Sequence, residues 1–144
     1  MRILTVLFLG MVLLAALDAT ADAAKEATVY KDPRCGCCNG YVAILRANGF
    51  AVAAVNLDDM SPLKRMAGVP DILESCHTTV IDGYVVEGHV PLAAIDRLLR
   101  QKPAIKGIAL PGMPAGSPGM GGRKERPFEI YGFSGKGHRV YTVE

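Results

Sequence analysis

The sequence predicts an α/β domain whose elements follow the order β-α-β-α-β-β-α, with a C-terminal extension after it. Apolar runs with the period of a strand alternate with runs of helical period between residues 27 and 102. Turn-forming residues, mainly glycine, proline and aspartate, separate these runs. A third observation is a cluster of three cysteines, Cys35, Cys37 and Cys38, between the first predicted strand and the first predicted helix.

The first half of the domain alternates strand and helix. Residues 27–31 are rich in strand formers, and apolar side chains at helical spacing follow the cysteines as far as Gly49, a typical C-cap glycine. A second strand is predicted at residues 50–56. A short helix then begins at Ser61, with proline at the next position, and stops near Gly68.

The second half is a hairpin followed by a helix. Residues 78–81 and 84–87 read as strands on either side of an Asp-Gly pair, which is a strong signal for a two-residue turn. A helix with leucine and isoleucine on one side runs from Pro91 to Lys102. These elements complete a domain over residues 24–102.

Residues 103–144 form the predicted extension. Residues 103–122 are so rich in glycine and proline that we expect no regular structure there, and we expect no ordering by backbone hydrogen bonds in residues 111–122. A β-hairpin is predicted from the strand-like runs at residues 128–133 and 138–143.

The N-terminus predicts a cleavable signal peptide over residues 1–23. Arg2 is followed by an apolar run and then by small residues in an A-x-A pattern at Ala21 and Ala23. We therefore expect a periplasmic protein with no stable membrane insertion after cleavage. The alternative is a retained anchor, but the run is short for a membrane span and contains Gly10.

Charge and cysteine content exclude two classes of protein. The chain has 16 basic and 14 acidic residues without a basic stripe, so we expect no nucleic-acid partner. Four cysteines are too few for a disulfide scaffold of the small secreted kind, and the adjacent Cys37 and Cys38 cannot bridge each other without strain. The cysteines therefore indicate a site.

The position of the cysteines predicts a thioredoxin-like fold. Cys35 and Cys38 have C-x-x-C spacing beside a β-α-β pattern, with an additional thiol inside the motif. The N-terminus of the following helix favours the thiolate form, because its free N–H groups and dipole attract negative charge. On a thioredoxin-like frame, Cys76 and His77 would face Cys35 and Cys38.

The donor atoms favour copper over other metals. Soft thiolates select Cu(I), zinc or iron–sulfur clusters, and thioethers narrow the choice toward Cu(I). Met113 and Met120 stand in the glycine- and proline-rich loop, where they have little apolar surface to pack against. A zinc site would need well-separated ligands, and iron–sulfur proteins usually space their cysteines more widely.

Other candidates remain open between a ligand role and a structural role. Cys76 could be an ordinary buried cysteine, and His77 and His89 could each be a ligand or a hydrogen-bonded structural histidine. His138 is predicted at the surface. Met60 and Met66 are interpreted as packing residues of the short helix.

Three segments carry a family resemblance: YKDPRCGCC, SCHTTVIDGYVVEGHVP and GMPAGSPGM. Together they resemble the exported metal-binding family that includes the CopG copper-resistance proteins. The resemblance implies a thioredoxin-like domain, an extension that helps to bind metal, and a cysteine-bridged cluster of several copper ions. It also implies interconversion of Cu(I) and Cu(II) in the periplasm. The residues that it marks as ligands or neighbours of the metal are Cys35, Cys37, Cys38, Cys76, His77, His89, Met113 and Met120.

The chain departs from the family pattern at two places. Many members have a lysine–tryptophan pair where this chain has Gly40 and Tyr41, and an acidic residue where it has Gly121. Neither departure removes a ligand, but both bear on the redox tuning of the site.

The sequence leaves three functions in competition. The first is a copper-binding protein for copper tolerance that interconverts Cu(I) and Cu(II). The second is a thiol–disulfide oxidoreductase that uses Cys35 and Cys38 as catalytic residues, although such an enzyme needs neither Cys37 nor a methionine loop. The third is a non-catalytic copper carrier. For the first and the third function, we expect a periplasmic efflux or electron-transfer partner.

Overall fold

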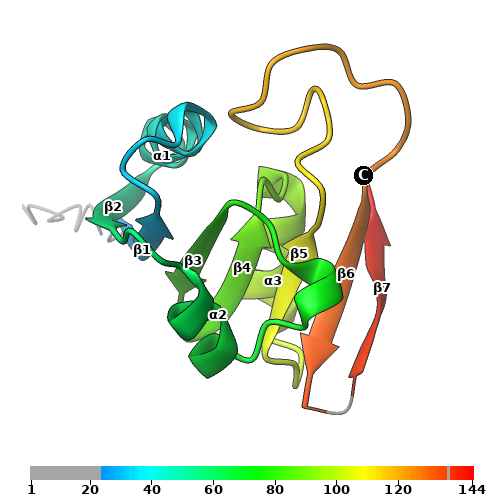
Figure 1. Ribbon diagram of the computed structural model, residues 1–144. Coiled ribbons are helices and arrows are strands. Elements are labelled where there is room, and N and C mark those ends of the chain that lie inside the picture. Colours follow the sequence, from blue (N-terminus) through cyan, green and yellow to red (C-terminus); the bar gives the residue numbers. More distant parts are fainter. Residues whose placement is uncertain (1–23, 136) are drawn as a thin grey trace, which may run out of the picture.

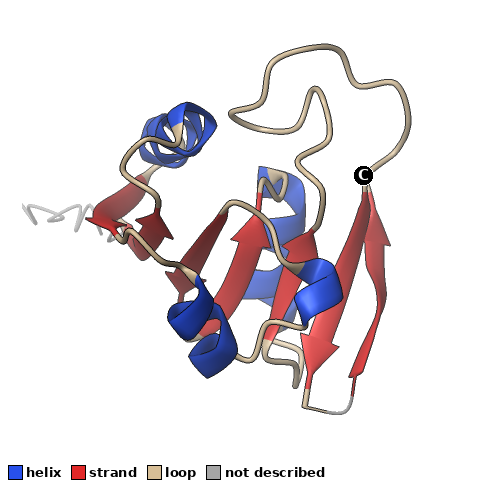
Figure 2. Cartoon of the chain, in the orientation of Figure 1, coloured by secondary structure: helices blue, strands red, loops and turns tan. Residues whose placement is uncertain are grey.

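Seven strands form one mixed sheet in the computed structural model, which describes residues 24–135 and 137–144 (Figure 2). The strands are β1 (Lys25–Lys31), β2 (Phe50–Asn56), β3 (His77–Ile81), β4 (Tyr84–Gly88), β5 (Gly107–Leu110), β6 (Glu129–Ser134) and β7 (Gly137–Val143). The helices are α1 (Gly36–Ala47), α2 (Ser61–Ala67), α3 (Leu92–Gln101) and the single 3-10 turn η1 (Asp71–Leu73). The predicted signal peptide lies outside the described residues.

The sheet order is β2-β1-β3-β4-β5-β6-β7. β1 pairs with β2 in parallel and with β3 in antiparallel fashion, and β3 and β4 form the predicted hairpin. The order β1-α1-β2-α2-β3-β4-α3 agrees with the sequence prediction, so the α/β class is confirmed. The thioredoxin-like assignment remains a prediction.

The two faces of the sheet are covered by different helices. Side chains of α1 and α3 pack with alternate strand residues such as Val86 in the larger core cluster. The preceding residue of β4, Val85, faces the opposite side and packs with Val69, which follows α2, and Leu73 of η1. In Figure 1, α2 lies in front of the sheet and α3 behind it. This alternation is what a strand buried on both faces requires.

The extension was predicted only in part. The β6–β7 hairpin is confirmed, with β6 at Glu129–Ser134 and β7 at Gly137–Val143. The expectation that residues 103–122 lack regular structure is wrong, because they contain β5. Ile108, Ala109 and Leu110 give this short strand an apolar surface that is buried on both faces, and β5 joins β4 to β6.

The loop after β5 is also ordered by backbone hydrogen bonds, contrary to the expectation. The Gly116 N–H donates to the Gly121 carbonyl at 3.1 Å, and the Met120 N–H donates to the Ser117 carbonyl at 2.9 Å. The Ser117 hydroxyl donates to the Pro114 carbonyl at 2.7 Å. Proline removes N–H donors but leaves carbonyl acceptors, so tight turns can close within such a segment.

The interpretation of Met66 as a packing residue is wrong, because the side chain is 78% exposed. Met60 is half-buried. The buried side chain of α2 is that of Lys64, and its charge is balanced by an ion pair with Glu87. Within the described residues, no helix is long and apolar enough to cross a membrane.

Candidate metal centre

Three chain segments bring the predicted cysteine and histidine residues of the site to one end of the sheet. Lys31 at the end of β1 pairs with His77 at the start of β3, and Glu87 near the end of β4 pairs with Thr78. The cysteine motif follows β1, and Cys76 precedes β3. His89 follows β4, so all these residues lie at the same end of the sheet.

The cysteine motif forms the first turn of α1. Cys35 is the N-cap residue, and its Sγ accepts a hydrogen bond from the Cys38 N–H at 3.3 Å. Cys35 and Cys38 form a disulfide, while Cys37 and Cys76 are free. Cys38 is fully buried and the other three cysteines are half-buried, so the cluster lies just beneath the surface.

The four sulfur atoms form one compact group. The Sγ atoms of Cys35, Cys37, Cys38 and Cys76 all lie within 4.8 Å of one another. Cys35 Sγ and Cys37 Sγ are 3.4 Å apart. The approach of Cys76 to the α1 cysteines, which the sequence predicted from the fold frame, is present in the structure.

Cys76 also belongs to a second group, with His77 and His89. Its Sγ lies 3.3 Å from His77 Nδ1 and 3.0 Å from His89 Nε2. The donor atoms of these three residues again lie within 4.8 Å of one another. Cys76 is therefore shared between an all-sulfur group and a sulfur–nitrogen group.

The loop after β5 fixes the orientation of His89. His89 Nδ1 lies 2.7 Å from the Pro118 carbonyl oxygen. Because a carbonyl only accepts hydrogen bonds, Nδ1 carries the proton, and the lone pair of Nε2 points at Cys76. A carbonyl partner on the far nitrogen is the usual way in which proteins orient a metal-binding histidine.

Tyr41 completes the packing around the histidines. Its ring lies 4.5 Å from the His77 ring and 5.6 Å from the His89 ring, centroid to centroid. The fully buried hydroxyl donates to the Val90 carbonyl at 3.0 Å. The sequence marks Tyr41 only as a departure from the family pattern, because no local signal pairs it with β3 or β4.

Burial controls the protonation of Cys76 and His77. Desolvation raises the pKa of Cys76 to about 12, and the neighbouring Cys37 contributes to the rise. Desolvation lowers the pKa of His77 to about 3, aided by His89 and Lys64 and opposed by the Gly88 backbone. Near neutral pH Cys76 is therefore a thiol and His77 is a neutral imidazole, and a bound metal ion would displace the Cys76 proton.

The chemistry of the donor set fits copper. Thiolates suit Cu(I), and imidazole suits copper in either oxidation state. His77 turns Nδ1 toward Cys76 Sγ, so this nitrogen is the one that could bind a metal ion together with Cys76, while Nε2 is buried without a hydrogen-bond partner among the described residues.

The two loop methionines differ in their surroundings. Met113 is 42% exposed and has a positive φ of 46°. Met120 is half-buried and follows Gly119, whose Cα faces the first turns of α1 so closely that an added Cβ would lie 2.8 Å from the Cys37 carbonyl oxygen. The backbone at Met120 is therefore held beside the cysteine motif.

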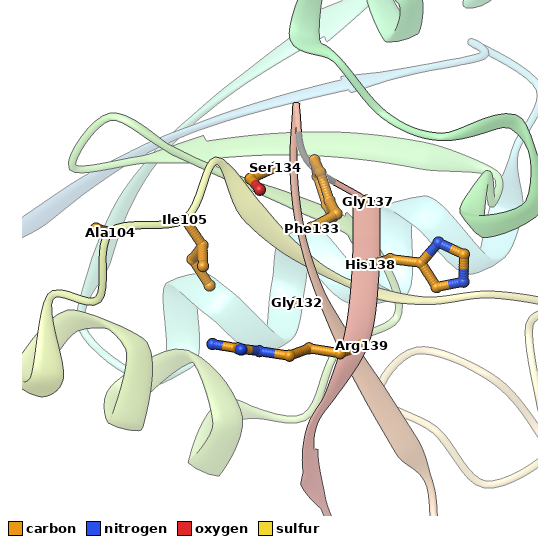
Figure 3. A pocket seen from close by; sticks show the side chains of 8 residues that line it. All are labelled: Ala104, Ile105, Gly132, Phe133, Ser134, Gly137, His138 and Arg139. Carbon is orange, nitrogen blue, oxygen red and sulfur yellow. The ribbon is translucent and has the colours of Figure 1, made fainter.

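His138 and the pocket around it lie away from this centre. His138 is exposed on β7, as predicted, and its ring stacks edge-on against Tyr131 at 6.0 Å. Figure 3 shows the pocket of about 270 Å³ between the β6–β7 hairpin and the segment before β5. The sheet registers put this hairpin end opposite the end of β4 that leads to His89.

The fold and the site together define an α/β protein with a cysteine- and histidine-lined centre that can hold a soft metal. Two solved structures are similar to the chain, and both are titled copper resistance protein CopG. For Form 2 the identity is 42%, the TM-score is 0.76, and the match covers 83% of this chain and 98% of that chain. For Form 1 the identity is also 42%, the TM-score is 0.77, and the match covers 84% and 98%. The chain belongs to the CopG family of copper resistance proteins.

The comparison with protein-family models gives a consistent result. A family described as a protein of unknown function, DUF411, matches residues 73–120. This range contains Cys76, both buried histidines and both loop methionines. The comparison with curated proteins gave no match.

Proposed function

We propose that this protein is exported to the periplasm, binds copper through Cys35, Cys37, Cys38 and Cys76, and supports copper tolerance by interconverting Cu(I) and Cu(II). The observation that carries the proposal is the group of four sulfur atoms within 4.8 Å of one another. The names of the two similar structures support a role in copper resistance. The N-terminal sequence pattern supports export.

The arrangement of donors suits a metal that changes oxidation state. Cu(I) prefers soft sulfur ligands and needs few of them, so closely spaced thiolates can bridge several ions. On the other side of Cys76, the imidazoles of His77 and His89 are donors that also suit Cu(II). Met113 and Met120 would add neutral thioethers that favour Cu(I).

Cys35 and Cys38 can supply the electrons for copper reduction. Conversion of their two thiols to the disulfide seen in the structure releases two electrons and two protons. Two Cu(II) ions accept one electron each and become two Cu(I) ions. Cys37 and Cys76 remain as thiols, with the two histidines, to hold the product.

The proposal is tested by mixing the reduced protein with Cu(II) in the absence of oxygen. We expect two Cu(I) ions, measured with a chromophoric chelator, for every two thiols lost, and a Cys35–Cys38 disulfide found by mass spectrometry. The Cys35→Ser/Cys38→Ser variant should lose this reaction. Tight copper binding without Cu(I) formation would instead identify a carrier that passes ions to an efflux partner.

The disulfide itself favours a second candidate, a thiol–disulfide oxidoreductase. Cys35 is half-buried at the N-terminus of α1, where such enzymes place their attacking thiol. This function predicts reduction of a peptide disulfide without copper, at a rate that does not change in Cys37→Ser. Copper-dependent chemistry that needs Cys37 favours the first function.

A further inference from the structure

A buried polar network lies directly beneath the metal centre. Lys64 of α2, Thr78 of β3 and Glu87 of β4 are each at most 5% exposed. The Lys64 ammonium group contacts Glu87 Oε1 and lies 3.3 Å from Thr78 Oγ1. The Thr78 hydroxyl donates to Glu87 Oε2 at 2.6 Å.

The same carboxylate also holds the backbone next to Cys76. The Ser75 N–H donates to Glu87 Oε1 at 2.7 Å. Ser75 directly precedes Cys76, and Glu87 stands two residues before His89. One carboxylate therefore ties together the two segments that carry Cys76, His77 and His89.

Close packing leaves these two segments little room to shift. A Cβ added at Gly88 would lie 2.6 Å from Ser75 Oγ and 2.6 Å from the Leu110 carbonyl oxygen. Gly88 also has a positive φ of 76°. Ser75 therefore packs directly against the β4 backbone at Gly88, next to the residue whose carboxylate it contacts, Glu87.

Stability alone does not account for this network. Taking an ammonium and a carboxylate out of water is costly, and well-packed apolar residues in their place are often neutral or stabilising. Apolar residues, however, could not accept the hydrogen bond from the Ser75 N–H. The feature that is specific to Glu87 is the placement of the segment before Cys76.

We propose that Glu87, held in place by Lys64 and Thr78, is a positioning residue of the metal centre. Its hydrogen bond to the Ser75 N–H sets Cys76 Sγ between the α1 cysteines and the two histidines. The copper readout of this inference rests on the proposed function, whereas the placement of Cys76 does not depend on it.

Two double variants separate placement from charge. Lys64→Met/Glu87→Leu removes the ion pair and the acceptor for Ser75. Lys64→Met/Glu87→Gln also removes the ion pair, but the glutamine amide can still accept from Ser75 and donate to Thr78. The matched control is Lys25→Met/Asp96→Leu, which removes an exposed ion pair of 3.6 Å on the surface.

Competition with a chromophoric Cu(I) chelator measures the first readout on the reduced proteins. We expect the leucine variant to bind Cu(I) at least tenfold more weakly than the parent, with the glutamine variant and the surface control within threefold of it. A leucine variant that binds Cu(I) within threefold of the parent overturns the inference. A parent that binds no Cu(I) overturns the proposed function and leaves the second readout to decide the inference.

The second readout needs no copper. In the Cys37→Ser background with the Cys35–Cys38 disulfide formed, Cys76 is the one remaining thiol of the chain. Its reaction with a chromogenic disulfide reagent should become at least fivefold faster in the leucine variant and stay unchanged in the glutamine variant. Equal rates in all variants overturn the inference. If the leucine variant does not fold, hydrogen exchange of the Ser75 amide in the parent decides. Protection like that of the β3 amides supports the inference, and exchange at the rate of an open loop overturns it.

Discussion

His89 connects the loop after β5 to the cysteine cluster, because Nδ1 lies 2.7 Å from the Pro118 carbonyl oxygen while Nε2 lies 3.0 Å from Cys76 Sγ. The loop therefore acts on the site through the tautomer and orientation of one imidazole ring. A change that moves the loop should alter the site even if it leaves every proposed ligand in the chain.

Gly119→Ala should displace the loop from α1. Position 119 has a φ of 84°, and an added Cβ would lie 2.7 Å from the Tyr41 nitrogen, which is backbone and cannot move aside. We expect a loss of about 1–3 kcal/mol in the free energy of unfolding, faster proteolysis of the loop, and weaker Cu(I) binding. Urea unfolding, limited proteolysis and chelator competition measure these effects.

The matched control for this change is Gly121→Ala. Position 121 lies in the same loop, but nothing is within 4 Å of an added Cβ. We expect parental stability and copper binding from it. Equal behaviour of the two alanine variants would show that close contact between the loop and α1 does not matter to the site.

Met120→Leu should weaken Cu(I) binding more than Met113→Leu does. Both changes keep the apolar bulk and delete the sulfur, but the backbone beside Met120 is held against α1, whereas Met113 is 42% exposed. Loss of a thioether should also lower the reduction potential of the site, because thioethers favour Cu(I). If the two single variants and the double variant all keep parental affinity and potential, the loop is a structural cover and neither methionine is a ligand.

Cys37→Ser should reduce the copper content of the protein about as much as Cys35→Ser. The sulfur atoms of these residues are 3.4 Å apart and belong to one group of four, so each should bridge shared ions. Metal analysis after gel filtration gives the copper content. If the Cys37→Ser protein binds as much copper as the parent, Cys37 is not part of the site. That result would support a Cys35/Cys38 redox pair and the thiol–disulfide oxidoreductase function.

The N-terminal pattern predicts that the protein recovered from cells begins at or near Ala24 and is found in the periplasmic fraction. The reason is the succession of a positive residue, an apolar run and an A-x-A site. Intact-mass measurement on fractionated cells checks both points. An unprocessed chain in the membrane fraction would indicate a retained anchor.

Local sequence patterns were sufficient for most of the fold. The Asp82-Gly83 turn, the capping glycines and the apolar periods placed β1 through α3 because each signal is complete within a few residues. β5 was missed because its three apolar residues are followed at once by Pro111, and only the pairing with β4 and β6 makes them a strand. Such non-local pairing leaves no periodic signal in the sequence.

The sequence predicted those site residues whose side-chain type indicates metal binding. It did not predict the residues whose role depends on which groups they contact in the fold. The four cysteines and two histidines were chosen for their donor atoms, and the fold brings them together. Lys64 was missed because its charge pattern is that of a solvated helix face, while its true partner, Glu87, is 23 residues away. The Pro118 carbonyl was missed because a backbone acceptor has no residue-type signal at all.

The central claim is that sulfur atoms from all four cysteines bind copper in one centre when the Cys35–Cys38 disulfide is reduced. X-ray absorption at the copper edge of the Cu(I)-loaded protein, combined with the copper content per chain, tests it most directly. We predict more than one copper ion per chain, a first shell dominated by sulfur, and a copper–copper distance short enough to detect. A single ion with a shell of nitrogen and oxygen, or no copper retained after washing with a weak chelator, would contradict the account.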